Sequence, residues 1–195
     1  VEDTLYNFYP HDTRQFTNYN GLIIGGSGTG KSFLVSTIAA QMKKVKARQI
    51  FIDIGGSYRN LCAVMRGTYI DMNLASDTNR INPFDALAVD KPDPDVIDAT
   101  LAYLEKMMTD PAEGSLSRVQ MGILEEVLND LIGSKRGEAF YISDFRMGLQ
   151  RHSKDGEMLS RRLIPFCGPS GRFRNLADGP TQQSFENPMI VFDLT

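Results

Sequence analysis

One stretch of the sequence has the residue types and the spacing that bind the phosphates of a nucleotide. Residues 25–32 read Gly-Gly-Ser-Gly-Thr-Gly-Lys-Ser and match the pattern G-x-x-x-x-G-K-[ST]. The glycines permit positive φ angles and carry no Cβ, so that successive backbone N–H groups can point at phosphate oxygens. The lysine would reach the β- and γ-phosphates, and the serine hydroxyl would be a ligand of Mg²⁺.

We therefore predict a phosphate-binding loop that takes ATP together with Mg²⁺. Lys31 is its expected catalytic residue, and Ser32 is its expected metal ligand. The residues expected to contact the nucleotide are Gly25, Gly26, Ser27, Gly28, Thr29, Gly30, Lys31, Ser32 and Phe33.

Such a loop needs a strand that leads into it and a helix that follows it. The apolar run Leu22–Ile24 predicts a short buried strand, and residues 33–42 have an apolar pattern at helical spacing that continues to about Lys46. The helix would begin at the loop, so that its N-terminal N–H groups and the positive end of its dipole face the phosphates.

A second apolar run, Gln49–Ile54, predicts another buried strand, with Asp53 near its end. Strand, helix and strand within about 30 residues are typical of a βαβ unit, so we expect a parallel sheet that is covered on both faces. Ligands bind at the carboxyl ends of such strands, which predicts that Asp53 lies near the loop as a second catalytic candidate. Asp53 would hold Mg²⁺ through water or orient a catalytic water; alternatively, it caps the following turn.

Three later segments extend the predicted core. Residues 60–67 predict a short helix, residues 69–72 a third strand, and residues 188–194 a fourth, strongly apolar strand. With the loop, these elements place the chain in the α/β class, as a P-loop NTPase with a parallel sheet.

The middle of the chain has a different character. A charged linker with two prolines, residues 90–95, precedes a region in which apolar residues recur at helical spacing. We therefore expect an α/β core in residues 1–92, an all-helical insertion in residues 93–166, and a return to the core in residues 167–195.

Four helices are expected in the insertion. The second should end at Gly133, and the third should begin after an N-cap at Ser143. Methionines at helical spacing are most simply explained as core residues, and this prediction concerns Met107, Met108, Met121 and Met158.

The composition narrows the function classes. The chain has 195 residues and 42% hydrophobic content, enough for a sizeable core, and its net charge of −3 argues against tight nucleic-acid binding. It encodes no run of 18 apolar residues that would cross a membrane. Cys62 and Cys167 lack metal-ligand spacing and are expected as buried or half-buried thiols, and His11 and His152 as solvated side chains.

The catalytic acids of an ATPase are incomplete in this sequence. Such an enzyme needs an acid after an apolar strand for Mg²⁺, and usually a glutamate that orients the attacking water. Residues 190–193 read Ile-Val-Phe-Asp, but no glutamate follows Asp193. We expect the Walker B strand to lie beyond residue 195, so that this chain binds nucleotide and hydrolyses it poorly or not at all.

Several stretches, taken in order, resemble the type IV secretion and conjugation ATPases, the TraC-type traffic ATPases. The matching segments, within about residues 18–195, are 18–21, the loop with Phe33, 51–58, 82–84, 168–173 and 190–194. The resemblance implies a RecA-like ATPase motor domain with an all-helical insertion, of which this chain is a C-terminal fragment.

The resemblance also implies partners and a location. It implies a homo-hexamer at the cytoplasmic face of the bacterial inner membrane, which works with other secretion-system components in pilus assembly and substrate transfer. In hexameric motors an arginine of the neighbouring subunit often completes the site. Arg172 and Arg174 are candidates for that role, although they are equally well explained as surface residues.

Two other functions compete with a secretion ATPase. One is a DNA-translocating P-loop ATPase of the coupling-protein or chromosome-pump type, for which the sequence offers a basic cluster at residues 43–48. The other is a nucleotide-gated assembly module, in which ATP binding orders subunits without turnover.

Overall fold

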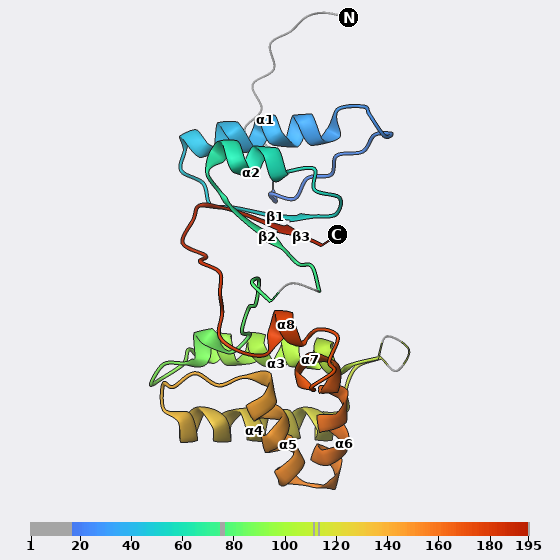
Figure 1. The fold of residues 1–195 in the computed structure, drawn as a ribbon, viewed down its shortest axis with the longest axis vertical. Helices are drawn as coiled ribbons and strands as arrows, with labels where there is room; N and C mark the ends of the chain where they lie inside the picture. Colours follow the sequence, from blue (N-terminus) through green and yellow to red (C-terminus); the bar gives the residue numbers. More distant parts are fainter. Residues whose placement is uncertain (1–16, 75–76, 111, 113, 195) are drawn as a thin grey trace, which may run out of the picture. The chain divides into compact units, whose positions relative to one another are not determined.

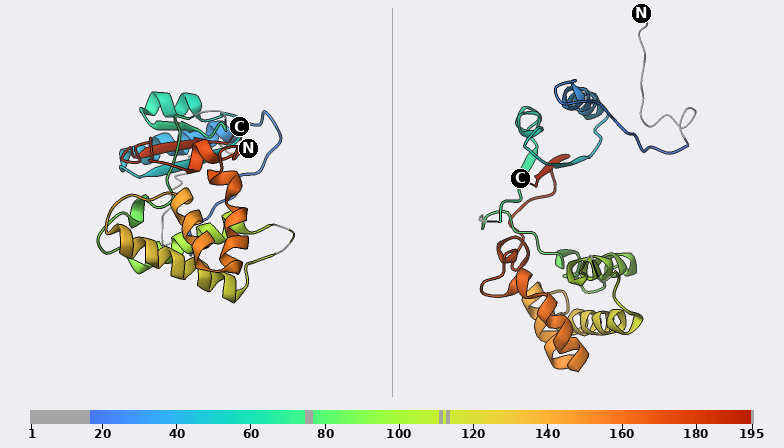
Figure 2. Two further views of the ribbon diagram at one scale, coloured as in Figure 1. Left: turned by 60° about the horizontal axis from the view of Figure 1, so that its bottom comes forward. Right: turned by 90° about the vertical axis from the view of Figure 1, so that its right-hand side faces the viewer.

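The structure, a computed structural model, describes residues 17–74, 77–110, 112 and 114–194. The chain divides into two units, Val1–Val45 and Lys46–Thr195. Figure 1 labels the elements along the ribbon, and Figure 2 gives two further views. Of the predicted features, His11 and residues 1–16 of the predicted α/β core lie outside the described residues.

Helix α1 (Lys31–Lys44) dominates the first unit and confirms the helix predicted after the loop. Gly30 precedes it at a φ of 89°, a left-handed conformation that glycine adopts without a steric penalty. Lys43 and Lys44 lie in the last turn, where positive charge is favoured by the helix dipole. The helix therefore starts at the motif itself.

The strand predicted at Leu22–Ile24 is wrong in this structure. These residues have no strand pairing, and Leu22 and Ile24 are 82% and 83% exposed. A strand forms only when its backbone is hydrogen-bonded to a neighbouring strand. The three strands of the described sheet pair with one another and not with residues 22–24. An apolar run thus indicates a tendency to be buried, but it does not supply a partner.

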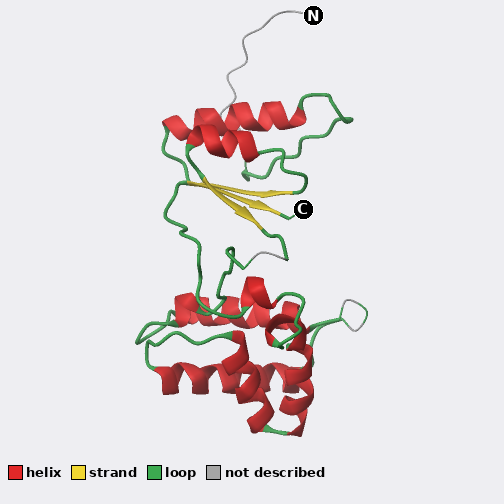
Figure 3. Cartoon of the chain, in the orientation of Figure 1, coloured by secondary structure: helices red, strands yellow, loops and turns green. Residues whose placement is uncertain are grey.

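The second unit contains a parallel sheet of three strands, β1 (Gln49–Asp53), β2 (Thr68–Asp71) and β3 (Met189–Asp193). Their order is β1-β3-β2, so that the last strand in sequence lies in the middle. The sheet is drawn in yellow in Figure 3. The parallel α/β architecture predicted from the sequence is confirmed.

Helix α2 (Arg59–Met65) connects β1 to β2 and packs on the sheet. Its Cys62 and Met65 form a small apolar core with Met189 and Val191 of β3. Gly67 follows the helix at a close approach, because a Cβ at this position would lie 2.9 Å from the carbonyl oxygen of Met189. Burial also raises the pKa of the Cys62 thiol, which keeps it protonated and unreactive.

The prediction that Gln49–Ile54 is fully buried is wrong for one face. Ile50, Ile52 and Ile54 are 59%, 74% and 76% exposed, whereas Asp53 is buried. The central strand β3 does meet the expectation for a parallel sheet, since Met189, Ile190 and Val191 are buried. Exposed and less exposed side chains alternate along β1 because successive side chains of a strand point to opposite faces, and only one face of β1 is covered.

The remaining elements of the second unit are helical. After a short 3₁₀ turn at Asp85–Leu87, they are α3 (Pro94–Met108), α4 (Arg118–Lys135), α5 (Ile142–His152), α6 (Lys154–Arg162), α7 (Ile164–Cys167) and α8 (Arg174–Ala177). Asp93 caps α3 through the N–H of Asp95, and a capping box of Ser117 and Gln120 starts α4.

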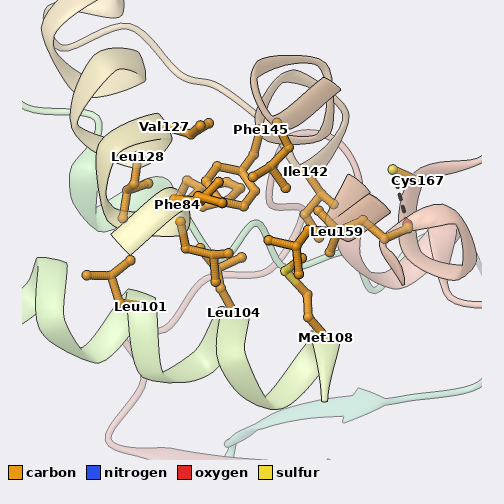
Figure 4. Packing of buried hydrophobic residues seen from close by; sticks show 14 of the residues in the cluster. Phe84, Leu101, Leu104, Met108, Val127, Leu128, Ile142, Phe145, Leu159 and Cys167 are labelled. Atoms are coloured by element: carbon orange, nitrogen blue, oxygen red, sulfur yellow. Dashed lines mark hydrogen bonds between the residues drawn. The ribbon is translucent and has the colours of Figure 1, made fainter. Parts of the chain in front are cut away.

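These helices enclose one apolar core, drawn in Figure 4. Phe84 is fully buried in it and stacks on Phe140, with ring centroids 4.8 Å apart. Leu104 of α3, Leu128 of α4 and Phe145 of α5 belong to the same cluster, so three helices share one interior. The core also includes Leu87, Cys167 and Ala177, and it therefore reaches beyond the predicted insertion at both ends.

Local details of the helices differ from the sequence predictions. Helix α4 runs through Gly133 to Lys135, because packing of its apolar face outweighs the propensity cost of one glycine. The cap of α5 is Tyr141, and Ser143 lies inside the helix, where its N–H donates to Asp178 Oδ1. Met158 is 68% exposed and not a core residue, whereas Met108 is buried.

His152 is exposed, as the sequence predicted, and it also has a partner on a neighbouring helix. Its Nε2 lies 2.8 Å from Glu126 Oε2, so that it joins α5 to α4. Such a pair depends on two helices packing together, and the sequence near His152 gives no sign of it.

Two connectors lead into and out of the helical region, and they are hydrogen-bonded to each other. The N–H of Ile81 donates to the carbonyl of Leu176, and the N–H of Gln182 donates to the carbonyl of Arg80. The N–H of Asn82 donates to Thr181 Oγ1 at 2.7 Å. These contacts hold the two ends of the helical region together independently of the sheet.

The core and the paired connectors predict that residues 80–183 fold without the rest of the chain. A fragment of residues 93–166 lacks Phe84, Leu87 and Ala177, and the loss of a single buried Phe costs about 3–5 kcal/mol. We expect cooperative thermal unfolding of the longer fragment, followed by circular dichroism, and a non-cooperative transition of the shorter one. Equal cooperativity of the two fragments would contradict this assignment of the core.

Candidate nucleotide site

The loop before α1 has the backbone that a phosphate cradle requires. Gly28 and Gly30 have φ angles of 77° and 89°, a region in which other residues are strained. A Cβ at Gly25 would lie 2.6 Å from Thr29 Oγ1, so a larger residue here would displace the Thr29 hydroxyl. Thr29 Oγ1 donates to the carbonyl of Gly26 at 2.8 Å, which closes the loop on itself.

Lys31 lies at the first position of α1, and its side chain turns back over the loop. Its Nζ donates to the carbonyl oxygens of Gly25 and Gly26, at 2.6 and 2.5 Å. The ammonium thus lies beside the loop backbone, in the part of the motif where phosphates are bound. Lys31 also links the two ends of the loop, because Gly25 begins the motif.

Ser32 and Phe33 are the next two residues of α1, and both are exposed. Mg²⁺ commonly takes one or two protein oxygens together with phosphate oxygens and water, and the Ser32 hydroxyl fits this donor set. Groups of three or more acidic, His or Cys side chains with metal-binding geometry do not occur among the described residues. The described chain therefore supplies no separate protein cage for a metal.

A second set of polar residues lies at the carboxyl edge of the sheet. The strand register pairs Asp53 with Asp193, and Asp193 with Asp71, so one aspartate ends each strand at the same level. Ligands of parallel α/β sheets bind outside this edge. The three aspartates lie at one level because β3 pairs with both other strands. The sequence of β1 by itself pointed only to Asp53.

Asp53 has the contact that its capping alternative predicts. Its Oδ2 accepts the N–H of Tyr58 at 3.2 Å, across the turn made by Gly55 and Gly56. Asp53 is only 7% exposed. Its predicted catalytic role stays a prediction.

Asp193, at the end of the central strand, is part of a cluster that sequence reasoning missed. Tyr69 donates its hydroxyl proton to Asp193 Oδ2 in a short hydrogen bond, and Arg59 Nη2 lies 3.9 Å from the same oxygen. The guanidinium carbon of Arg59 lies 4.8 Å from the centre of the Tyr69 ring. These residues come from α2, β2 and β3, and the only local signal was an arginine soon after a glycine turn at a strand end.

Electrostatics keep the Tyr69 hydroxyl protonated and Arg59 charged. Burial and the hydrogen bond to Asp193 raise the pKa of Tyr69, so its hydroxyl keeps its proton at neutral pH. The interaction with Tyr69, and then the charge of Asp193, raise the pKa of Arg59 further above its ordinary value. Arg59 is therefore a permanent cation at the carboxyl edge of the sheet.

An apolar cavity lies in the second unit. It has a volume of about 690 Å³, and α3, the 81–86 segment and the α7–α8 region supply most of its lining. It includes none of the residues predicted to contact nucleotide. The predicted site rests on the loop and not on this cavity.

Comparisons with known proteins agree with the loop. The TraG P-loop domain family matches residues 5–145. Protein TraC of Escherichia coli (strain K12) is 35% identical over 68 residues, which is 35% of this chain and 7% of that protein. The chain therefore spans only a small part of TraC.

A solved structure has the same fold. VirB4 of Thermoanaerobacter pseudethanolicus superposes with a TM-score of 0.70 at 21% sequence identity, over 91% of this chain and 50% of that chain. No helix in the described part of the chain is long and apolar enough to cross a membrane. The family match, the TraC relative and the shared fold confirm the resemblance noted in the sequence: this chain belongs to the TraG P-loop domain family of type IV secretion and conjugation ATPases.

Proposed function

We propose that this chain is the ATP-binding part of a motor that uses ATP hydrolysis to power pilus assembly and substrate transfer in a type IV secretion or conjugation system. The observation that carries the proposal is the loop, with two left-handed glycines and Lys31 folded over it at the start of α1. Family membership supports ATP as the nucleotide, with Mg²⁺ as its usual companion.

Each residue of the loop has a proposed role. The residues Gly25–Gly30 present backbone N–H groups to the phosphates, and Lys31 neutralises the β- and γ-phosphates. Ser32 contributes a hydroxyl oxygen to Mg²⁺, and Phe33 flanks the nucleotide. When bound, Mg²⁺ would offset the charge that develops on the phosphates during transfer.

The organisation and partners are also proposals. We propose a P-loop core in residues 1–92, an all-helical insertion in residues 93–166 and a return to the core in residues 167–195. The helical core of Figure 4 supports a separate helical part, although it also includes Leu87, Cys167 and Ala177 outside these bounds. We further propose a homo-hexamer that acts with other secretion-system components at the cytoplasmic face of the bacterial inner membrane. The net charge of −3 disfavours DNA as a tight ligand of this part.

A specific observation favours one alternative, a nucleotide-gated assembly module without turnover. Asp193 ends an apolar strand as a Walker B acid would, but its carboxylate is engaged by Tyr69 and Arg59. Moreover, Asp53 and Asp193 are followed by Ile54 and Leu194, not by a glutamate that could orient water. Binding alone could then order the subunits.

The loop assignment predicts the effect of Lys31→Ala. Charge-assisted hydrogen bonds contribute about 1.5–3 kcal/mol, so we expect Mg·ATP affinity to fall by about 10- to 150-fold. Lys44→Ala removes the same charge from the far end of α1 and should change affinity by less than about twofold. Isothermal titration measures both variants. Unchanged affinity of Lys31→Ala, in a protein with normal thermal unfolding, would refute the site.

The missing glutamate predicts how this chain handles ATP. We expect Mg·ATP binding by titration, with steady-state phosphate release at the level of Lys31→Ala, and no stimulation by added DNA. Turnover that Lys31→Ala abolishes would show that acids of this chain serve catalysis. Turnover that rises with DNA would favour the translocase alternative instead.

A further inference from the structure

We propose that the Thr29 hydroxyl holds the phosphate loop in its nucleotide-binding shape, so that Thr29 is a positioning residue of the site. The proposal rests on the proposed nucleotide-binding function and concerns the first unit alone. Thr29 occupies a position that the motif leaves open to any residue type, so the pattern itself assigns no role to its side chain.

The side chain of Thr29 reaches back to the start of the loop. Its Oγ1 donates to the carbonyl of Gly26 at 2.8 Å, and a Cβ at Gly26 would lie 3.7 Å from Thr29 Cγ2, an ordinary contact distance. The same hydroxyl fills the space beside Gly25, where a Cβ would lie 2.6 Å from it. Because threonine is β-branched and stiff about χ1, keeping the hydroxyl on the carbonyl costs little side-chain entropy.

Two side chains donate to the Gly26 carbonyl. Besides Thr29, Lys31 Nζ donates to it at 2.5 Å, and it also donates to the carbonyl of Gly25 at 2.6 Å. An ammonium has three donors, so the phosphate contacts proposed for Lys31 compete with its carbonyl contacts. The single proton of the Thr29 hydroxyl serves the Gly26 carbonyl alone. Thr29 therefore holds this carbonyl whether or not Lys31 has turned to a phosphate.

Holding one carbonyl also fixes the backbone that follows it. A peptide unit is planar and trans, so the direction of the Gly26 carbonyl sets the direction of the Ser27 N–H. The N–H groups of this loop are the proposed phosphate donors. Without the hydroxyl the loop would sample more conformations, and that freedom would be lost when a nucleotide binds. Thr29 thus increases affinity by ordering the loop beforehand.

The competing explanation is that Thr29 stabilises the fold. Thr29 is exposed, and water can replace a hydrogen bond that is lost at an exposed site, so such a bond adds little to the stability of the chain. The two explanations differ in what they change. A stabilising role changes the melting temperature, whereas a positioning role changes nucleotide affinity at an unchanged melting temperature.

The test removes the hydroxyl with little change of shape. Thr29→Val replaces the hydroxyl by a methyl group, and Thr29→Ser keeps the hydroxyl but loses the methyl group. Thr37→Val is the matched control, because Thr37 Oγ1 also donates to a backbone carbonyl, that of Phe33 at 2.9 Å, farther along α1. Isothermal titration of the whole chain with Mg·ATP and Mg·ADP gives the affinities, and differential scanning calorimetry gives the melting temperatures.

We expect Thr29→Val to weaken the binding of both nucleotides by about 3- to 10-fold, the loss that one neutral hydrogen bond produces. Thr29→Ser should restore most of the affinity, because it restores the donor to the Gly26 carbonyl. Thr37→Val should bind as the wild type does. The melting temperatures of Thr29→Val and Thr37→Val should be equal.

Three results would overturn the proposal. Equal affinities of Thr29→Val and Thr37→Val would show that the hydroxyl does not order the loop for binding. A loss with Mg·ATP alone would indicate a direct contact with the terminal phosphate. A loss that Thr29→Ser shares, or one that accompanies a lower melting temperature of Thr29→Val, would assign the side chain to packing.

Failure of the proposed function looks different. In that case the wild-type chain binds neither nucleotide, or Lys31→Ala binds as well as the wild type. If only the role of Thr29 is wrong, the wild type still binds and Lys31→Ala still binds weakly, but Thr29→Val keeps the affinity of the wild type.

Discussion

The pairing of β3 with both β1 and β2 is the constraint on which the second unit depends. The strands β1 and β2 are close in sequence, yet neither pairs with the other in the described sheet. They are held together by a strand that returns only after the entire helical region. Closing so long a loop is entropically costly, and the hydrogen bonds between residues 80–82 and 176–182 reduce that cost because they fix the two ends side by side.

The same pairing creates the chemistry at the carboxyl edge. In a parallel ladder the register decides which strand ends lie at one level, and here it aligns three aspartates. A slip of one residue would turn the side chain of Asp193 to the other face of the sheet, away from Tyr69 and Arg59. Burial of Ile190 and Val191 on opposite faces of β3 disfavours that slip. The small apolar core beside α2 and the polar cluster therefore both depend on one strand.

Features that depend on neighbouring residues could be predicted from the sequence. The loop motif, α1, the apolar strand β3 and most helices follow from local spacing and capping. Features that depend on a distant partner could not. The run Leu22–Ile24 has no strand to pair with. Helix α4 continues past Gly133 because its apolar face is packed. The contact of Tyr69 with Asp193 joins two strands that are far apart in sequence. The sequence identified Asp53 as a polar residue at the strand end, but it left open whether this residue serves catalysis or caps the following turn, as its contact with Tyr58 does.

The loop itself shows why a motif does not determine an affinity. Lys31 satisfies its ammonium with the carbonyls of Gly25 and Gly26, so a phosphate must compete with contacts that the loop already makes. The net gain is the difference between two sets of hydrogen bonds, which is much smaller than either set alone. These hydrogen bonds also hold the first residues of the loop against the start of α1. A loop that is ordered in this way loses less conformational entropy when a phosphate binds.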